Sequence, residues 1–387
     1  TDDDGDSFTR QVHLPVANVA PEIDPNRELE HVIPAGGRLL WSTTLSDPGT
    51  DSHDVTINYN RTLVETGRPA RITKNVIELD ARYDTPGLYS INSVIEDDDF
   101  GKTTYETLTN VIVTSLWVSA REQGDRGEQL VIRDVVADGF AVAERNANNA
   151  VTVSTTKREI DGVEIDGFQL MTAPTSRSEV DPSELIGSSI DGAESDDDHT
   201  GIFVPVTLVD ADTILIELGD GDDTLVLTDI PEALGKTVIV DAGAGNDLID
   251  ATGLESPVSV QGGDGNDTIL GGNAADTIDG GPGHDSITGG AGDDRITVSL
   301  GTDTADGGTG TDQLYAAGDH DMDLDDSTLV IGPTTVTISG HESAHLVGGN
   351  SANLIDASGF SGSTIIEGLR GDDRIIAGAQ SAMIYGG

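Results

Sequence analysis

The clearest pattern of apolar and polar positions lies in residues 262–315, where it repeats every nine residues. Read in nines, the stretch is GGDGNDTIL, GGNAADTID, GGPGHDSIT, GGAGDDRIT, VSLGTDTAD and GGTGTDQLY. The eighth place of each nine holds an apolar residue: Ile269, Ile278, Ile287, Ile296, Ala305 or Leu314. Because side chains alternate across a strand, an apolar residue between two outward neighbours predicts a short strand with that residue pointing inward. The sequence therefore predicts a repeat architecture of short strands.

Each nine also carries an aspartate at its sixth place, after a glycine-rich half. These residues are Asp267, Asp276, Asp285, Asp294, Asp303 and Asp312. Glycine adopts the left-handed backbone conformations of tight turns without steric cost. Such turns leave carbonyl oxygens unshielded, and calcium takes its ligands from carboxylate and carbonyl oxygens. The spacing therefore predicts that these aspartates bind Ca2+.

The repeat matches the nonapeptide Gly-Gly-x-Gly-x-Asp-x-U-x and resembles the RTX, or haemolysin-type, calcium-binding family. The resemblance implies a parallel β-roll in which two successive nines form one coil. Aspartates two repeats apart would then share an ion, which pairs Asp267 with Asp285, Asp276 with Asp294, Asp285 with Asp303, and Asp294 with Asp312. The alternative is a flexible Gly/Asp-rich linker, but linkers are defined by composition and lack a strict register.

Aligned carboxylates repel one another, and one apolar residue per nine gives only a thin core. A ligand that binds the folded state alone stabilises it by mass action, and calcium would also remove the repulsion. We therefore expect this segment to be largely disordered without calcium and folded with it.

The same signal extends to both sides of the best repeats. LGDGDDTLV at 218–226 and AGAGNDLID at 242–250 place Asp223 and Asp247 at the sixth place, with Leu225 and Ile249 inward. After residue 315 the phase breaks, because Asp321 keeps the register while Asp323 stands where the apolar residue should be.

The signal then returns, since the sequence from Leu248 aligns without gaps on the sequence from Leu354 and indicates a duplicated unit. In the second copy Asn353 replaces the aspartate, which should weaken that site, while Asp373 keeps it. The predicted calcium-binding roll spans 218–387, with its best repeats at 262–315 and a second copy at 348–387.

The first part of the chain has a different pattern. Alternating runs at 39–45, 55–59, 76–79 and 89–95, bounded by turn residues, predict a β-sandwich. The turns at 46–49 (SDPG) and 84–89 (DTPGLY) are similar to those of bacterial PKD-like, immunoglobulin-type modules, over residues 8–115. The resemblance implies a spacer. The acidic turn and strand from residue 96 repeat those that open the chain, so residues 1–7 are expected to be the tail of a preceding copy.

Residues 116–217 predict a β-rich connector. Apolar runs at 131–137, 140–143, 151–153 and 202–209 suggest strands, and Asp-Gly pairs at 161–162 and 166–167 suggest hairpin turns. The fold class is therefore all-β: an immunoglobulin-like sandwich, the connector, and a parallel β-roll of nonapeptide repeats.

Composition narrows the range of partners. Asp and Glu total 70 against 20 Lys and Arg, which gives a formal net charge of −50. Nucleic acids and anionic membranes both require basic surfaces, so divalent cations are the natural partner. The absence of cysteine excludes disulfides and thiolate zinc sites. No apolar run is long enough to cross a bilayer, so we expect no membrane insertion.

One motif suggests a different chemistry. His341, Glu342 and His345 spell HExxH, as in the metzincin-type zinc proteases, some of which carry RTX repeats. That chemistry requires both histidines on one face of a helix. The β-branched run at 334–339 and Gly340 oppose a helix, and Ser351 stands at the third ligand place.

A second motif imitates the start of an EF-hand. Asp319, Asp321, Asp323 and Asp325 alternate, but Leu324 replaces the glycine and Val330 the last glutamate of such a loop. An acidic face of an exposed strand is the better interpretation.

These patterns predict a non-enzymatic, calcium-binding structural or adhesive segment of a large secreted or cell-surface protein, located outside the cell. Its expected partners are calcium ions and cell-surface or matrix ligands. Two alternatives remain open at this point. The chain could be the non-catalytic part of a secreted RTX hydrolase, or the roll could serve only export.

Overall fold

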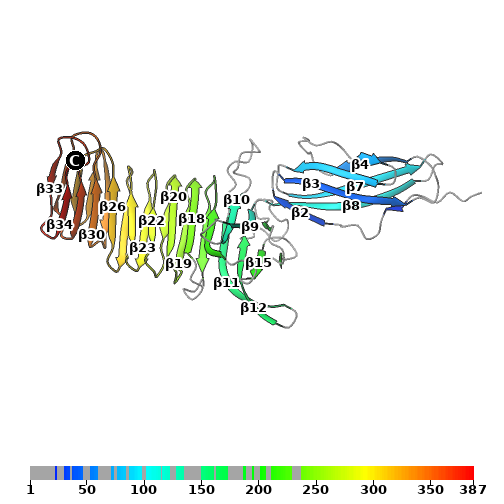
Figure 1. Cartoon of the computed structure of the whole chain (residues 1–387), viewed down its shortest axis with the longest axis horizontal. Coiled ribbons are helices and arrows are strands. Elements are labelled where there is room, and N and C mark those ends of the chain that lie inside the picture. The colour runs from blue at the N-terminus through cyan, green and yellow to red at the C-terminus, as the bar shows by residue number, and fades with distance from the viewer. Residues whose placement is uncertain are drawn as a thin grey trace, which may run out of the picture. The chain divides into compact units, whose positions relative to one another are not determined.

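The computed structural model describes strands β1–β15 between Glu22 and Pro205, and then residues 211–228 and 237–387 (Figure 1). The described residues contain β-strands and no helix, which agrees with the predicted all-β class. The same residues contain no helix long and apolar enough to cross a membrane. The chain divides into two compact units, the first built from Thr1–His31, Arg38–Arg82 and Tyr89–Val111 and the second from the other residues.

The N-terminal region has two four-stranded sheets. In spatial order, one contains β1 (Glu22–Ile23), β3 (Gly37–Ser46), β6 (Val76–Tyr83) and β5 (Arg71–Thr73), and the other β2 (Glu30–Pro34), β8 (Lys102–Thr114), β7 (Gly87–Asp97) and β4 (His53–Tyr59). The pairs β1–β3, β5–β6 and β4–β7 are antiparallel. The strands predicted at 39–45, 55–59, 76–79 and 89–95 lie in β3, β4, β6 and β7.

Apolar residues of these sheets alternate as a buried face requires. Leu39, Trp41 and Leu45 are buried, whereas Leu40 between them is exposed. The ring of His31 in β2 meets that of Trp41 in β3 edge-on, with 6.3 Å between centroids, so the contact joins the two sheets. The immunoglobulin-type assignment itself stays a prediction, and residues 1–7 lie outside the described part.

The strands predicted for the connector continue the two sheets of the roll. One sheet begins with β13 (Ile186–Ser188), β9 (Leu116–Glu122) and β10 (Glu128–Asp134), and the other with β14 (Glu194–Ser195), β15 (Gly201–Pro205), β12 (Val163–Thr172) and β11 (Ala150–Ile160). β10 pairs in parallel with β16 (Ala211–Glu217), and β11 with β17 (Thr224–Thr228). Ile132, Val153 and Leu170 belong to the same buried cluster as the roll residues. The strand expected at 140–143 lies outside the described residues.

Only one of the two expected Asp-Gly turns joins two strands. β11 and β12 pair antiparallel from Ile160 opposite Val163, so residues 161–162 connect them. The second pair lies inside β12, with Lys157 opposite Asp166 and Thr156 opposite Gly167. The prediction of a turn at 166–167 is wrong because antiparallel pairing with β11 continues through that point and keeps the backbone extended.

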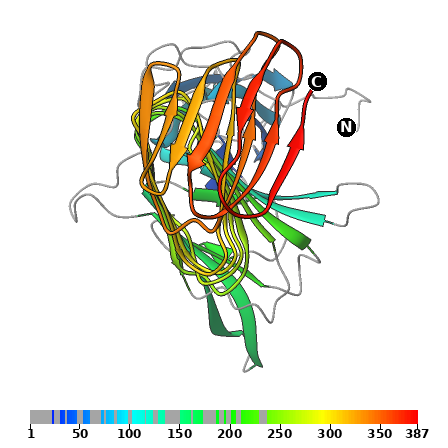
Figure 2. The same ribbon diagram turned by 90° about the vertical axis from the view of Figure 1, so that its left-hand side faces the viewer.

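From residue 213 to 385 the chain forms a parallel β-solenoid, as predicted for the roll. One sheet continues from β16 through β18 (Thr237–Ala244), β20 (Val258–Asp264), β22 (Thr277–Asp279), β24 (Arg295–Val298), β26 (Gln313–Ala317), β30 (Ser343–Val347), β32 (Ser363–Glu367) and β34 (Ala382–Tyr385). The other continues from β17 through β19 (Leu248–Gly253), β21 (Thr268–Leu270), β23 (Ser286–Ala291), β25 (Thr304–Thr309), β29 (Thr334–Ser339), β28 (Thr328–Ile331), β27 (Met322–Asp325), β31 (Leu354–Gly359) and β33 (Arg374–Ile376). Each coil contributes one strand to each sheet, and Figure 2 shows the yellow coils superposed when viewed along the stack.

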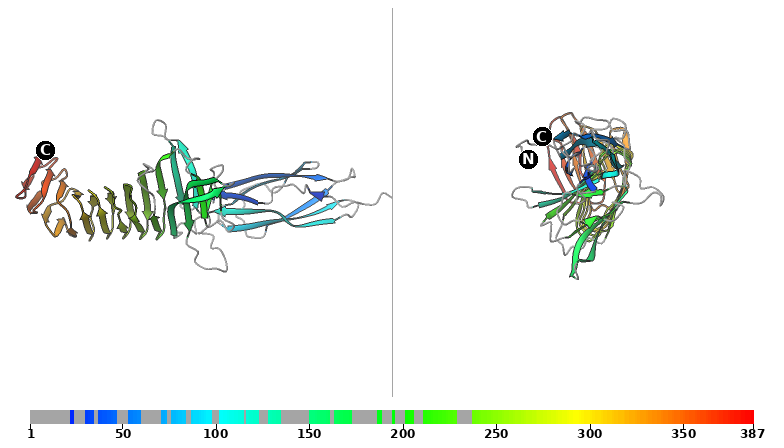
Figure 3. Two further views of the ribbon diagram at one scale, coloured as in Figure 1. Left: turned by 90° about the horizontal axis from the view of Figure 1, so that it is seen from below. Right: turned by 90° about the vertical axis from the view of Figure 1, so that its right-hand side faces the viewer.

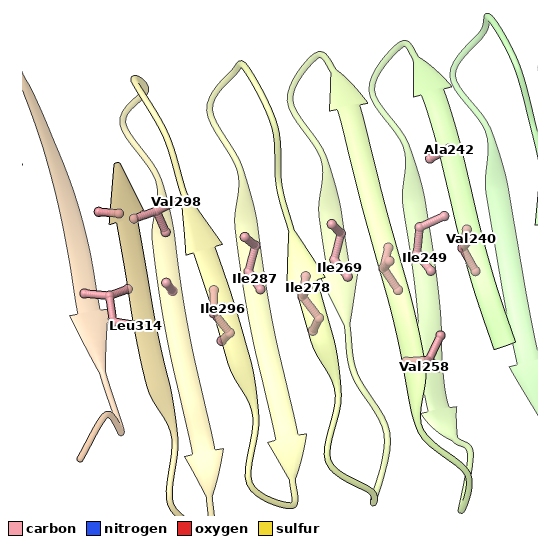
Figure 4. Close-up of a cluster of buried hydrophobic side chains, with 14 of the residues drawn as sticks. Val240, Ala242, Ile249, Val258, Ile269, Ile278, Ile287, Ile296, Val298 and Leu314 are labelled. Carbon is pink, nitrogen blue, oxygen red and sulfur yellow. The ribbon is translucent and has the colours of Figure 1, made fainter. Parts of the chain in front are cut away.

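The predicted inward residues form the core of the solenoid. Ile269, Ile278, Ile287, Ile296, Ala305 and Leu314 each expose at most 1% of their surface. Parallel register places Ile269 opposite Ile287 and Ile278 opposite Ile296, so the side chains stack in columns between the sheets (Figure 4). Burial of an isoleucine contributes about 1.5–3 kcal/mol. Each strand of the best repeats buries only one or two apolar residues, as β22 does with Ile278 and β24 with Ile296 and Val298.

The break in the repeat corresponds to an inserted hairpin. β27 and β28 pair antiparallel, and β28 pairs antiparallel with β29. Met322 and Leu324 point inward and Asp323 points outward, which confirms that the nine-residue phase breaks here. Met322 pairs with Ile355, which shifts the strand by one residue relative to the nine-residue phase. Figure 3 shows the orange and red coils beyond this point tilted relative to the yellow ones.

Replacing one core isoleucine should destabilise the solenoid far more than replacing its neighbour. Ile278 is fully buried in β22, whereas Thr277 is exposed on the same strand. We expect Ile278→Ala to lower the free energy of unfolding in saturating calcium by about 2–5 kcal/mol. Thr277→Ala should change it by less than about 0.5 kcal/mol. Urea unfolding followed by circular dichroism measures both, and equal effects would contradict the inward assignment.

Candidate metal centre

The predicted aspartates occupy one kind of position, the last loop residue before a strand of the solenoid. Eight of them expose 4% of their surface or less: Asp223, Asp247, Asp267, Asp276, Asp285, Asp294, Asp303 and Asp312. Asp373, which precedes β33, is half-buried. The loops can turn there because glycines take positive φ angles, as at Gly263 (φ 101°), where an added Cβ would collide with the carbonyl oxygen of Gly243.

The aspartates stack in two columns along the solenoid, one on each side. The first column contains Asp223, Asp247, Asp267, Asp285 and Asp303, and the second Asp276, Asp294 and Asp312. In the second column, the amide N–H of Asp276 donates to Oδ1 of Asp294 and that of Asp294 to Oδ1 of Asp312, each at 2.8 Å. The first column has the same bonds at 2.8–3.0 Å. All four aspartate pairs inferred from the repeat are direct neighbours here.

The Asn353 position keeps the pattern with a neutral side chain. Its amide N–H donates to Oδ1 of Asp373 at 2.9 Å, and its own Oδ1 accepts from the amide of Gly349 at 3.1 Å. The pair therefore carries one carboxylate where the two columns carry two, as the sequence indicated.

The second carboxylate oxygen, Oδ2, faces a gap between coils. In Asp247, Asp267, Asp294 and Asp312 this atom is buried and has no hydrogen-bond partner. A Cβ added to Gly289 would lie 2.5 Å from Oδ2 of Asp294 and 2.5 Å from the carbonyl oxygen of Gly307 in the next coil. Gly262 stands in the same relation to Asp267 and Gly280. Glycine thus leaves a space where a carboxylate oxygen and a carbonyl oxygen converge.

This donor set fits calcium, because Ca2+ prefers carboxylate and carbonyl oxygens in flexible geometry. No cluster of three or more His, Cys, Asp or Glu side chains that could hold a metal occurs among the described residues. The columns bring carboxylates together in pairs, so the remaining ligands of an ion would be backbone oxygens and water.

Burial perturbs the acidity of these groups. The pKa of Asp247 is raised to about 7: burial raises it most, the hydrogen bond from the Asp223 amide lowers it, and the nearby charges of Asp267 and Asp222 raise it. The pKa values of Asp285 and Asp294 rise to about 6, again mainly through burial. Burial likewise raises the pKa of Asp267, Asp276, Asp303 and Asp312. Without a cation, the folded solenoid holds these carboxylates charged at a free-energy cost.

The comparison with known families agrees with this geometry. Residues 259–287, 288–322 and 358–387 match the family model of the RTX calcium-binding nonapeptide repeat (4 copies). The C-terminal region carries RTX repeats. This repeat family binds Ca2+, and the matched segments contain Asp267 to Asp312 and Asp373. Asp223 and Asp247 precede the first matched segment but extend the same column of RTX aspartates. No curated protein matches the chain.

The HExxH residues do not form a zinc site. His341 follows strand β29 in a turn, and His345 lies in strand β30 rather than on a helix. Nε2 of His345 contacts Oε1 of Glu367 at 3.0 Å, and its ring meets Tyr315 edge-on. Glu342 instead turns to the aspartate column, where its Oε2 accepts the amide N–H of Asp312 at 2.9 Å.

The alternating aspartates at 319–325 do not converge on a common site either. Asp319 accepts hydrogen bonds from Ser351, and Asp321 from the amide of Leu354. Asp325 caps the turn at Ser327. The three carboxylates bind separate backbone segments, which agrees with an acidic exposed face.

The sequence reasoning missed Glu342 as a member of the second column. A signal was present, because Glu342 stands two residues before the buried Ala344, as each RTX aspartate stands two residues before its inward residue. Glu342 is also part of the HExxH sequence, which is typical of zinc proteases rather than of calcium sites.

The raised pKa values predict an unusual pH dependence for the calcium-free chain. A buried carboxyl whose folded pKa exceeds its unfolded value stabilises the folded state while protonated, and that stability is lost as pH rises through the folded pKa. In chelator, the residual strand signal of the solenoid should therefore be greatest at pH 5 and fall toward pH 8, the range that spans the values of about 6 and about 7 for Asp294 and Asp247. Circular dichroism at a series of pH values measures the trend.

The matched variant for this prediction is Asp247→Asn, which cannot ionise. It should flatten the pH dependence and leave more strand signal than the unmodified chain has in chelator at pH 8. A strand signal that rises with pH in chelator, in both proteins, would contradict the assignment.

Proposed function

We propose that the solenoid binds calcium ions between adjacent coils and folds on binding them. The proposed ligands are Oδ2 and neighbouring oxygens of Asp223, Asp247, Asp267, Asp276, Asp285, Asp294, Asp303, Asp312 and Asp373, together with glycine carbonyls. The observation that carries the proposal is the buried Oδ2 of Asp247, Asp267, Asp294 and Asp312, which has no partner in the protein. A bound calcium ion would supply the positive charge that these buried oxygens lack.

The role of the solenoid is structural rather than catalytic, as expected for RTX repeats. Calcium binding would then order the loops and neutralise the aspartate columns at the same time as the apolar residues are buried between the sheets. Because the metal-free loops concentrate like charges, the folded state of the apo chain loses stability in proportion to the number of stacked carboxylates.

We further propose that the chain acts outside the cell, as a structural or adhesive part of a secreted or cell-surface protein. The strongly acidic composition and the absence of cysteine support stabilisation by metal rather than by disulfides. In this arrangement residues 8–115 form a PKD-like, immunoglobulin-type spacer, residues 116–217 connect it to the roll, and residues 218–387 form the roll. Binding of the purified chain to cells or matrix in millimolar calcium, abolished by chelator, tests the adhesive role.

Calcium removal should unfold the best repeats. Each site held at a hundredfold over its dissociation constant contributes about 2.7 kcal/mol, and the columns offer several such sites. We expect chelation to abolish most of the strand signal of the solenoid in circular dichroism, and calcium to restore it. Magnesium at the same concentration should restore little, because it demands octahedral geometry and dehydrates reluctantly. A strand signal unchanged by chelator would refute folding on calcium binding.

Two adjacent aspartates provide a matched pair of variants. Asp294 is buried in the second column and shared by the pairs with Asp276 and Asp312, whereas Asp293 is exposed. Asp294→Asn should lower the number of bound calcium ions and raise the calcium concentration at the midpoint of calcium-induced folding. Asp293→Asn removes the same charge and should change neither by more than about twofold, since isolated surface charges contribute little. Isothermal titration calorimetry distinguishes the two, and identical behaviour would count against the column as the binding site.

A further inference from the structure

The second column continues beyond its last aspartate through Glu342. The amide N–H of Asp312 donates to Oε2 of Glu342 at 2.9 Å, as the amides of Asp276 and Asp294 donate to the next aspartate at 2.8 Å. The two residues are separated by 30 positions rather than the 18 of the other pairs in this column. A glutamate therefore takes the aspartate place after the inserted hairpin.

The glycine carbonyl of the gap is also present in this last coil. A Cβ added to Gly307 would lie 2.8 Å from Oδ2 of Asp312 and would collide with the carbonyl oxygen of Gly340. In the preceding coil Gly289, Asp294 and the carbonyl of Gly307 have the same arrangement. Gly340, with φ 68°, turns its backbone so that its carbonyl takes the place of the coil glycine.

The carboxylate of Asp312 lacks a partner in this gap. Asp312 exposes none of its surface, and its Oδ2 is buried without a hydrogen bond. Burial raises the pKa of Asp312, and the charges of Glu342, Asp293 and Asp306 raise it further. A buried carboxylate oxygen without a hydrogen bond, among other negative charges, is stabilised by a cation.

The first column, by contrast, ends at the insertion. Thr304 pairs with Thr337, so the residue that follows Asp303 in register is Val336, which is fully buried. The strand after the insertion therefore pairs in the solenoid with an apolar residue at the position that an aspartate occupies in the other coils. The carboxylate in the second column is therefore not a requirement of the solenoid fold.

We propose that Asp312 and Glu342, with the carbonyl oxygen of Gly340, form a further calcium site at the end of the second column. The proposal rests on the calcium binding proposed above for the aspartate columns. It assigns the glutamate of the HExxH sequence to a calcium ion, not to hydrolytic chemistry. Because Glu342 is exposed, this ion would keep contact with solvent, unlike ions deeper in the column.

The test compares calcium stoichiometry in variants of the full 387-residue chain. Equilibrium dialysis with radioactive Ca2+ alone counts bound ions, and titration calorimetry gives their affinities. Glu342→Gln should bind one ion fewer than the unmodified chain, or bind one ion at least tenfold more weakly. Glu367→Gln is the control, because Glu367 is an acidic residue of the next strand, β32, that contacts His345 and lies outside the columns. It should leave the number of ions unchanged.

The outcomes separate this proposal from the one it rests on. If the unmodified chain binds no calcium, the proposed function fails. If it binds calcium and Glu342→Gln binds the same number with the same affinity, only the site at Glu342 is overturned. Zinc bound one to one and lost in Glu342→Gln would also overturn it.

A variant that keeps the charge covers the case in which Glu342→Gln does not fold. Glu342→Asp retains the carboxylate but shortens the side chain by one methylene. We expect it to fold in saturating calcium and to bind one ion more weakly than the unmodified chain. Suppose that Glu342→Gln does not fold and that Glu342→Asp binds every ion with unchanged affinity. This result would contradict a role of the Glu342 carboxylate as a calcium ligand, because the shorter side chain should hold the ion less well.

Discussion

The stacking of buried carboxylates at the pitch of one coil is the interaction on which the solenoid depends. Each aspartate accepts the amide of the aspartate below through Oδ1, which links coils and fixes their register. The same stacking brings like charges together in a buried column, where burial raises their pKa values. In Asp247, Asp267, Asp294 and Asp312, Oδ1 therefore serves the protein and Oδ2 is left for a cation, whereas Oδ2 of Asp276 accepts the amide N–H of Gly272.

Glycines in the loops and isoleucines in the strands make this arrangement possible. Glycines at the loops leave room for Oδ2 and present carbonyl oxygens to the same gap, as Gly289 and Gly307 do beside Asp294. Isoleucines two residues after the aspartates fill the space between the sheets, as Ile287 and Ile296 do (Figure 4). Because each strand of the best repeats buries only one or two apolar residues, the hydrophobic contribution to stability is small, and cation binding must contribute to folding.

The coils adapt in length without losing the columns. Neighbouring aspartates of the first column are separated by 24, 20 and then 18 residues, and the bond from amide to Oδ1 keeps a length of 2.8–3.0 Å throughout. The inserted hairpin of β27 and β28 is accommodated outside this bond pattern, and the second column resumes at Glu342. Extra residues are tolerated where they leave the aspartate place and the inward place intact.

The sequence by itself determined the features that repeat. The positions of Asp267 to Asp312 and of the inward isoleucines follow from the nine-residue period. The pairing of aspartates two repeats apart is what the resemblance to the RTX family implies. The tertiary structure alone decided the features set by distant or irregular contacts. These are the continuation of both sheets into β10 and β11, the antiparallel pairing of β28 with β27 and β29, and the return of Glu342 to the column. Each depends on strand pairing between segments of different length, and a local period carries no information about such pairing.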